Sequence, residues 1–155
     1  MTPNTPIARV LQEMGIPHRI FRHTAPIHTL EEAAAARGQS PQQIVRSILF
    51  RLGAGEYVLV LAAGPAQISW PKLRRQLGKS RLTMAKPAEV LAITGYPVGA
   101  VGPLGLKTPV PILVDESVLV QEEISMGSGE RGIAVILRVD DLLRALGGYQ
   151  TVSLR

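Results

Sequence analysis

The segment TGYPVGAVGPLG, residues 94–105, constrains the fold of this chain most, because it holds four glycines and two prolines in twelve residues. Glycine frees the backbone and removes the Cβ atom, whereas proline fixes φ and stiffens the chain. Turns alone rarely need so many glycines and prolines together. We therefore expect a shaped loop that brings bare main chain close to a ligand.

Short helical and strand patterns alternate irregularly on both sides of this segment. Helical spacing and capping residues predict helices over residues 6–14, 29–38, 69–78, 86–95 and 140–148. Strands are expected over residues 18–22, 44–52, 56–64 and 132–139, and in the stretches VPILVDESV and VLVQEEIS. The 155 residues thus predict one α+β domain, residues 1–155, with a mixed, curved or partly barrel-like sheet surrounded by short helices.

Composition narrows the classes of function. The chain has no cysteine, which excludes disulfides, cysteine-ligated zinc and thiol catalysis. His18, His23 and His28 are spaced by five residues, which matches no metal-ligand pattern, so we expect no metal and no cofactor. The N-terminus lacks the order of a signal peptide, and the longest apolar runs fall far short of the ~20 residues that span a bilayer. We expect a soluble, cytoplasmic protein with no membrane partner.

A modest positive charge accompanies these features. The formal net charge is +5 and the computed pI about 10.1, which suits a polyanionic partner. Basic residues gather at Lys72, Arg74, Arg75 and Lys79, and continue at positions 81 and 86. This cluster is either a phosphate-facing patch or a solvated helix face, and Trp70 beside it either stacks on a base or belongs to the core.

Two further features are candidates for a site. The stretch GSGERG, residues 127–132, leads into a strand-like run rather than a helix, which favours a Gly-rich turn facing a pocket over a dinucleotide fingerprint. Ser128 within it is a turn serine or a ligand contact. Arg46 begins an apolar strand, where its guanidinium is either exposed at the strand end or holds an anion or a developing oxyanion beside the glycine loop.

Taken in order, the stretches QIVRSILF, TGYPVGAVGPLG, PILVDESV, GSGERGIAVIL and VDDLL resemble the YbaK-like family of aminoacyl-tRNA deacylases. This family includes free-standing editing proteins and the editing domain inserted in bacterial prolyl-tRNA synthetases. The resemblance covers residues 5 to 147. It implies hydrolysis of the ester that joins a wrong amino acid to the tRNA 3′ end, without a metal or covalent nucleophile, in a pocket whose size excludes the correct amino acid.

The resemblance also implies the site residues. The glycine loop would wall the pocket with main chain, and the 127–132 turn would close it. Catalytic roles fall to Arg46, Gly99 and Gly102. Substrate contacts fall to Phe21, His23, Gly95, Tyr96, Val98, Ala100, Pro103, Gly105, Gly127, Ser128 and Gly129. Contacts to tRNA fall to Lys72, Arg74, Arg75 and Lys79.

Two positions depart from the family pattern. The family usually has a lysine where this chain has Arg46, and many relatives have an acid where it has Ala134. A second function therefore stays open, in which the chain is a weak or inactive homologue that binds tRNA or another adenosine-bearing ligand. A third is a protein that acts in a complex with an aminoacyl-tRNA synthetase. The sequence leaves the oligomeric state unassigned.

Overall fold

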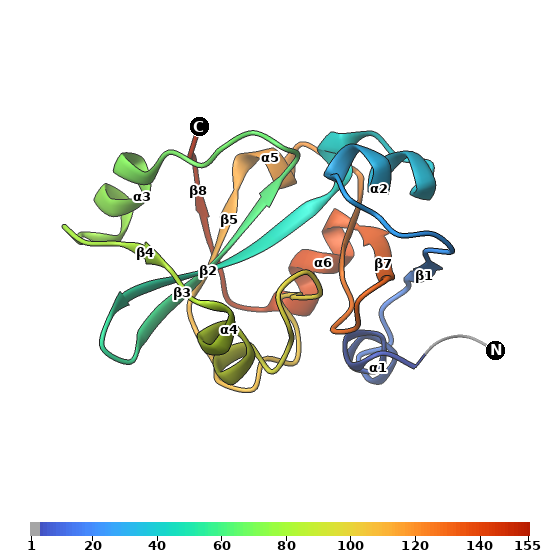
Figure 1. Cartoon of the computed structure of the whole chain (residues 1–155), viewed down its shortest axis with the longest axis horizontal. Helices are drawn as coiled ribbons and strands as arrows, with labels where there is room; N and C mark the ends of the chain where they lie inside the picture. The colour runs from blue at the N-terminus through green and yellow to red at the C-terminus, as the bar shows by residue number, and fades with distance from the viewer. Residues whose placement is uncertain (1–3) are drawn as a thin grey trace.

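The computed structural model describes residues 4–155, which form two β-sheets with short helices packed around them (Figure 1). The larger sheet has the order β4-β2-β3-β5-β8, with β2 (Val45–Gly53) and β3 (Glu56–Ala63) as an antiparallel hairpin at its centre. β5 (Ile112–Asp115) runs parallel to β3, and β8 (Gln150–Val152) runs parallel to β5. β4 (Thr83–Met84) forms the other edge.

The smaller sheet is antiparallel and has the order β1-β7-β6. β1 (Arg19–Arg22) and β6 (Glu123–Gly127) flank β7 (Ile133–Arg138). A single bridge between Ile44 and Ser125 links the two sheets where β2 begins. The sheets stay open, so the α+β prediction with a curved, mixed sheet is confirmed and no closed barrel forms.

The predicted helix starts depend on their capping residues. Thr5 accepts a hydrogen bond from the Ala8 amide at α1 (Pro6–Glu13), and Thr29 accepts one from the Glu32 amide at α2 (Leu30–Arg37). Ser69 does the same for the Lys72 amide at α3 (Trp70–Leu77). Capping satisfies amide groups that the first helical turn leaves unpaired. α4 (Pro87–Thr94) and α6 (Val139–Leu146) complete the predicted set.

Two predicted strands have other bounds than expected. The strand expected in VLVQEEIS begins at Glu123 rather than at Val118. In VPILVDESV the strand stops at Asp115, whose carboxylate accepts a hydrogen bond from the Ser117 amide and begins the short helix α5 (Glu116–Leu119). The 3₁₀ turn Pro41–Gln43 was also not predicted. Among the described residues, no helix has the length and apolar character needed to cross a membrane.

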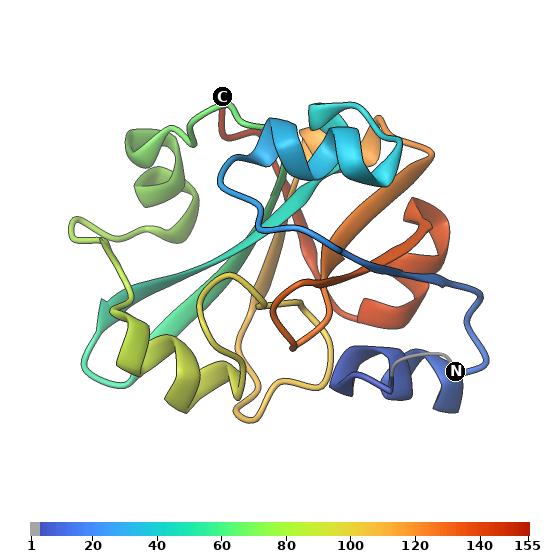
Figure 2. The same ribbon diagram turned by 45° about the vertical axis from the view of Figure 1, so that its right-hand side comes forward.

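The two faces of the β2–β3 hairpin pack against different cores. Val45, Leu49, Leu59 and Leu61 belong to the larger core between the two sheets. Phe50, Val58 and Val60 belong to a second core, which α3 covers on the opposite face. Because side chains alternate along a strand, each residue of β2 is assigned to one of these two sides. Figure 2 shows α2 and the glycine loop on the side of the smaller sheet.

Candidate active site

The two glycine segments pack directly on each other. A Cβ atom built on Gly102 would fall 2.2 Å from Ile7 Cδ1 and 2.5 Å from the Gly127 carbonyl oxygen. A Cβ atom on Gly127 would fall 2.3 Å from the Val101 carbonyl oxygen. The Gly129 amide also donates to the Ala100 carbonyl at 2.8 Å. Both glycines are therefore needed for this close approach of two backbones.

Two side chains hold the glycine loop in place. Tyr96 is buried, and its hydroxyl donates to the Leu104 carbonyl at 2.6 Å, with the Gly105 carbonyl oxygen 3.0 Å away. Its burial raises the pKa of the phenol above the ordinary value. Arg131 Nε donates to the Val98 carbonyl at 3.1 Å and so links the 127–132 turn to the tip of the glycine loop. The loop is thus a fixed wall.

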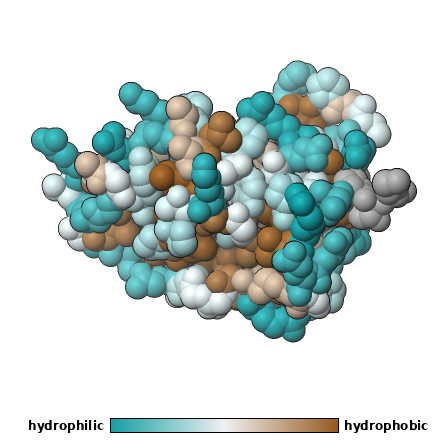
Figure 3. All heavy atoms as spheres, turned by 90° about the horizontal axis from the view of Figure 1, so that it is seen from below, coloured by the Kyte–Doolittle hydropathy of each residue, from teal (hydrophilic) through white to brown (hydrophobic). Residues whose placement is uncertain are grey.

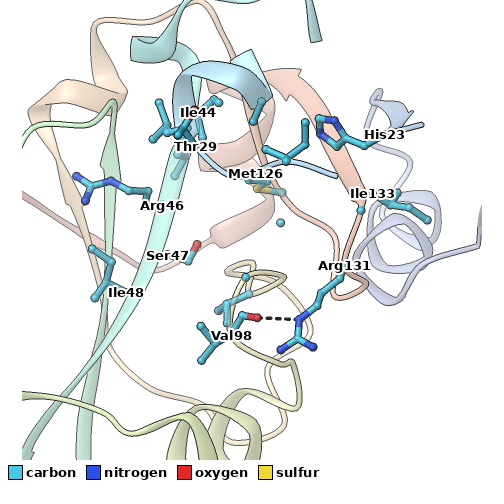
Figure 4. A pocket seen from close by; sticks show the side chains of 18 of the residues that line it. His23, Thr29, Ile44, Arg46, Ser47, Ile48, Val98, Met126, Arg131 and Ile133 are labelled. Carbon is cyan, nitrogen blue, oxygen red and sulfur yellow. Dashed lines mark hydrogen bonds between the residues drawn. The ribbon is translucent and has the colours of Figure 1, made fainter. Parts of the chain in front are cut away.

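A cavity of about 1010 Å³ lies between this wall, the start of β2 and the segment around α2 (Figure 4). Its apolar lining includes Ile44, Val45, Leu49, Val101 and Met126. The volume is at the upper end of the range of small-molecule pockets, and a lining of this kind with few polar groups is typical of them. Viewed from the side of α4 and the glycine loop, apolar atoms gather along the middle of the molecular surface (Figure 3).

The structure brings only part of the predicted site to the cavity. Arg46, His23, Val98, Gly99 and Gly127 line it. The remaining predicted catalytic and substrate-binding residues are not among its lining residues: Phe21, Gly95, Tyr96, Ala100, Gly102, Pro103, Gly105, Ser128 and Gly129. Four of these, Tyr96, Ala100, Gly102 and Gly129, lie at the contact between the two glycine segments.

Ser128 is an example of a residue with a structural part in this wall. Its side chain is fully buried, and its hydroxyl lies 2.8 Å from the Ile133 carbonyl oxygen, to which it donates. Ser128 Oγ also accepts a hydrogen bond from the Glu130 amide at 3.2 Å. The placement matches the turn serine rather than the ligand contact.

Arg46 lines the cavity, but its guanidinium points away from it (Figure 4). Its Nη2 donates to the Ala66 carbonyl at 2.6 Å, on the side of β2 that faces the second core. Burial and the nearby charge of Arg155 lower its pKa, and Asp115 opposes this effect. The expected cation beside the glycine loop is therefore not Arg46 in this conformation.

Ser47 occupies the strand position that faces the cavity. It lies opposite Leu61, on the side of β2 that also carries Val45 and Leu49. Its Oγ is buried and has no hydrogen-bond partner among the described residues. Ser47 was not among the predicted site residues. Side chains alternate along IVRSILF, so Ser47, the residue after Arg46, lies on the opposite face of the strand from Arg46 and is the polar residue there next to it.

Arg37 and His23 form a hydrogen-bonded pair in the cavity wall. Arg37, in the last turn of α2, donates from Nε to His23 Nε2 at 3.0 Å and from Nη1 to Ser125 Oγ at 2.9 Å. Burial lowers the pKa of Arg37, and burial together with the Arg37 charge lowers the pKa of His23. Arg37 was not predicted, because an arginine in a last helical turn is ordinary.

The basic helix α3 lies apart from the cavity. Leu73 of α3 packs in the second core, on the face of β2 opposite Ser47. Lys79 pairs with Glu56 at 3.0 Å, and Lys72 Nζ donates to the Arg155 carbonyl. Trp70 packs edge-on against Phe50, with ring centroids 5.3 Å apart. The structure thus favours a packing role for Trp70, and it does not bring Lys72, Arg74, Arg75 or Lys79 to the cavity.

Comparison with known proteins gives the site its family. The model of the aminoacyl-tRNA editing domain matches residues 24–145. The proline–tRNA ligase of Thermosipho melanesiensis is 34% identical over 105 residues, which are 68% of this chain and 18% of that protein. The proline–tRNA ligase of Kosmotoga olearia is 34% identical over 109 residues, covering 70% of this chain and 19% of that protein.

A solved structure matches over nearly the full length of both chains. It is the crystal structure of a candidate trans-editing enzyme for prolyl-tRNA synthetase, with a TM-score of 0.86 and 32% identity over 99% of this chain and 99% of that chain. The ligases are much longer, and this chain spans less than one fifth of their length. The match of the editing-domain model, which covers most of the chain and all of the cavity lining except His23, shows that this chain belongs to the aminoacyl-tRNA editing domain family.

Proposed function

We propose that this chain hydrolyses the ester of a misacylated tRNA in trans, removing a small amino acid from the 3′-terminal ribose. The observation that carries the proposal is the cavity of about 1010 Å³ with an apolar lining, in a chain of the editing-domain family. A cavity of this size accepts an acyl group together with its nucleoside. The free-standing structural relative supports action in trans.

The chemistry needs one water molecule and hydrogen-bond donors. Water oxygen attacks the ester carbonyl carbon, and the carbonyl oxygen becomes an oxyanion. The tetrahedral intermediate then collapses, the bond to the ribose oxygen breaks, and that oxygen takes up the proton released from the attacking water. The products are the free amino acid and a tRNA with a free terminal hydroxyl. Because an ester is an activated bond, positioning and charge stabilisation supply the main contributions.

The glycine loop supplies main-chain donors for this oxyanion. The amides of Tyr96 and Ala100 are used inside the loop, by Thr94 Oγ1 and the Pro97 carbonyl. In contrast, the Gly99 and Val101 amides donate to no other described residue, and both residues line the cavity. We assign the oxyanion donors to Gly99 and Val101. Gly102 acts through its contact with Gly127, as a positioning residue.

The lining contains no aspartate or glutamate among the described residues. Ala134, where many relatives have an acid, is buried in β7. A carboxylate base is therefore not part of this proposal. The second candidate function, a weak or inactive homologue that binds an acylated nucleotide, is favoured by the Arg46 guanidinium, which binds Ala66 and not the cavity.

A deacylation panel separates the two functions. Purified protein is incubated with tRNA that carries labelled alanine, cysteine, serine or proline, and release of the label is followed. Release of one small amino acid above the rate in buffer supports the enzyme. Folded protein that releases none, but binds an amide-linked aminoacyl-adenosine, supports the binding module. If only Arg46→Lys restores release, the arginine explains the loss of turnover.

We also propose that this chain contacts tRNA and a synthetase. We propose that the acceptor end of tRNA enters the cavity, while the basic residues of α3 contact the tRNA at a distance from it. Exchanging Arg74 and Arg75 for glutamine should weaken tRNA binding and leave hydrolysis of a short aminoacyl-nucleoside unchanged. A synthetase partner is proposed from the ligase relatives alone, and co-purification with a prolyl-tRNA synthetase tests it.

A further inference from the structure

The Arg37–His23 pair fixes the protonation of a histidine in the cavity wall. An arginine side chain carries only donors, so His23 Nε2 must be the acceptor of the 3.0 Å hydrogen bond from Arg37 Nε. An accepting ring nitrogen carries no proton. The neutral imidazole therefore has its proton on Nδ1, and the ring presents a donor there.

Protonation of the second nitrogen is opposed by the surroundings. A proton on Nε2 would point at the Arg37 guanidinium. Arg37 Nε would then lose its hydrogen-bond acceptor, and the two positive charges would repel each other. Among the described residues, Arg37 is the charged group whose field acts on His23, and it has no carboxylate within ion-pair distance. Phe21 packs edge-on against the ring at 5.0 Å and helps to fix its plane.

The Nδ1 donor has no partner inside the protein. The atom is buried and forms no hydrogen bond to any described residue, although His23 is part of the cavity lining. A buried donor without a partner costs free energy, and native structures rarely retain one without a reason. Such strained or unsatisfied groups concentrate at ligand sites.

We infer that His23 Nδ1–H donates a hydrogen bond to an acceptor oxygen of the acylated nucleoside, and that Arg37 is the positioning residue that selects this tautomer. The inference rests on the proposed function, because that function supplies the acylated nucleoside. A neutral imidazole donor backed by a guanidinium favours an oxygen that carries, or develops, negative charge. The ester carbonyl oxygen is such an acceptor.

The tautomer can be measured without any activity. In protein labelled with ¹⁵N-histidine, long-range ¹H–¹⁵N correlation distinguishes the protonated from the unprotonated ring nitrogen, and His23→Gln assigns the resonances among the three histidines. We expect His23 to be neutral with the proton on Nδ1 at pH 7 to 8. Addition of 3′-deoxy-3′-(alanylamino)adenosine should shift the Nδ1 resonance, whereas the others move less. A proton on Nε2, or an analogue that binds without moving Nδ1, overturns the inference.

Kinetics with matched variants tests the role in catalysis. The side-chain amide of asparagine places its nitrogen near the position of Nδ1, whereas that of glutamine places it near Nε2. His23→Asn should therefore keep more activity than His23→Gln, which should lose roughly 10- to 100-fold in kcat/KM, the range for one hydrogen bond to a charged group. Equal losses in the two variants, with both folded, contradict the assignment.

Arg37→Met should release the tautomer and lower kcat more than it raises KM. Arg22→Met, which removes an exposed arginine next to His23, is the matched control and should leave both constants unchanged. Arg37→Met that loses activity while His23 keeps its proton on Nδ1 refutes the positioning role. If wild-type protein shows the Nδ1 response to the analogue but hydrolyses no aminoacyl-tRNA, the proposed function fails and this inference stands.

Discussion

Replacing Gly102 by alanine tests whether the two glycine segments form one wall. The new Cβ atom would fall 2.2 Å from Ile7 Cδ1 and 2.5 Å from the Gly127 carbonyl oxygen, roughly 1 Å short of ordinary van der Waals contact. Ile7 can rotate, but the Gly127 carbonyl belongs to the end of β6. Overpacking of this kind costs about 1–3 kcal/mol.

The assay is thermal unfolding together with binding of the amide-linked analogue. For a chain of this length each kcal/mol lowers the midpoint by about 2–4 °C, so we expect a decrease of roughly 2–12 °C. Binding should weaken as well, because Val101 and Gly127, next to the contact, line the cavity. Gly148→Ala is the matched control, since nothing lies within 4 Å of its Cβ position.

A companion variant separates the two clashes. Ile7→Val removes the Cδ1 atom and leaves the Gly127 carbonyl in place. Measured against Ile7→Val alone, the double variant should therefore recover only part of the stability lost through Gly102→Ala. Gly102→Ala with an unchanged midpoint and unchanged binding would refute the reasoning, because the backbone would then have room for the side chain. Full recovery in the double variant would show that Ile7 alone sets the limit.

Three further predictions follow from single side chains. Ser47→Ala removes a buried hydroxyl that has no partner, so it should leave the free energy of unfolding unchanged or raise it by up to about 1 kcal/mol. Binding of the analogue should weaken. A loss of stability in urea unfolding would contradict this prediction. Tyr96→Phe should cost about 1–2 kcal/mol by leaving the Leu104 carbonyl unpaired, as measured by the urea midpoint, and no change would show that another donor replaces the hydroxyl. Because the pKa of His23 is lowered in the folded protein, the unfolded chain binds more protons than the folded chain just below pH 6.5. The free energy of unfolding is therefore highest above that pH, and it decreases as the pH falls toward the pKa of the folded state. His23→Asn should flatten this part of the pH–stability curve, and an unchanged slope would assign it to another group.

The helices of eight residues and the two strands of the β2–β3 hairpin follow from local signals in the sequence. Thr29 and Ser69 lie at the predicted helix starts, and the hairpin of β2 and β3 forms around the GAG turn. β4 and β8 were not predicted, because strands of two and three residues are too short for an alternating pattern to register. Their pairing depends on neighbours that only the folded chain provides.

The placement of Arg46 could not be predicted for a different reason. β2 carries apolar residues on both faces, Val45 and Leu49 on one and Phe50 on the other, so the pattern does not say which face borders a cavity. The same limit applies to the glycines. Their density indicated close approach of main chain, but the partner of Gly102 is Gly127, which is distant in sequence. Long-range contacts of this kind leave no local signal.

The charges around the cavity determine what kind of substrate atom it favours. Arg37 and Arg131 line it, and no acid does among the described residues, so the lining carries positive charge even with the Arg46 guanidinium turned away. A positive, largely apolar cavity stabilises an oxygen on which negative charge grows, and it opposes a buried ammonium group. Under the proposed function, the α-amino group of the aminoacyl ester is therefore best placed toward the solvent, with the ester carbonyl inward. This orientation directs the reacting carbon to the walls that hold the Gly99 amide and His23 Nδ1, which is where the proposed donors lie.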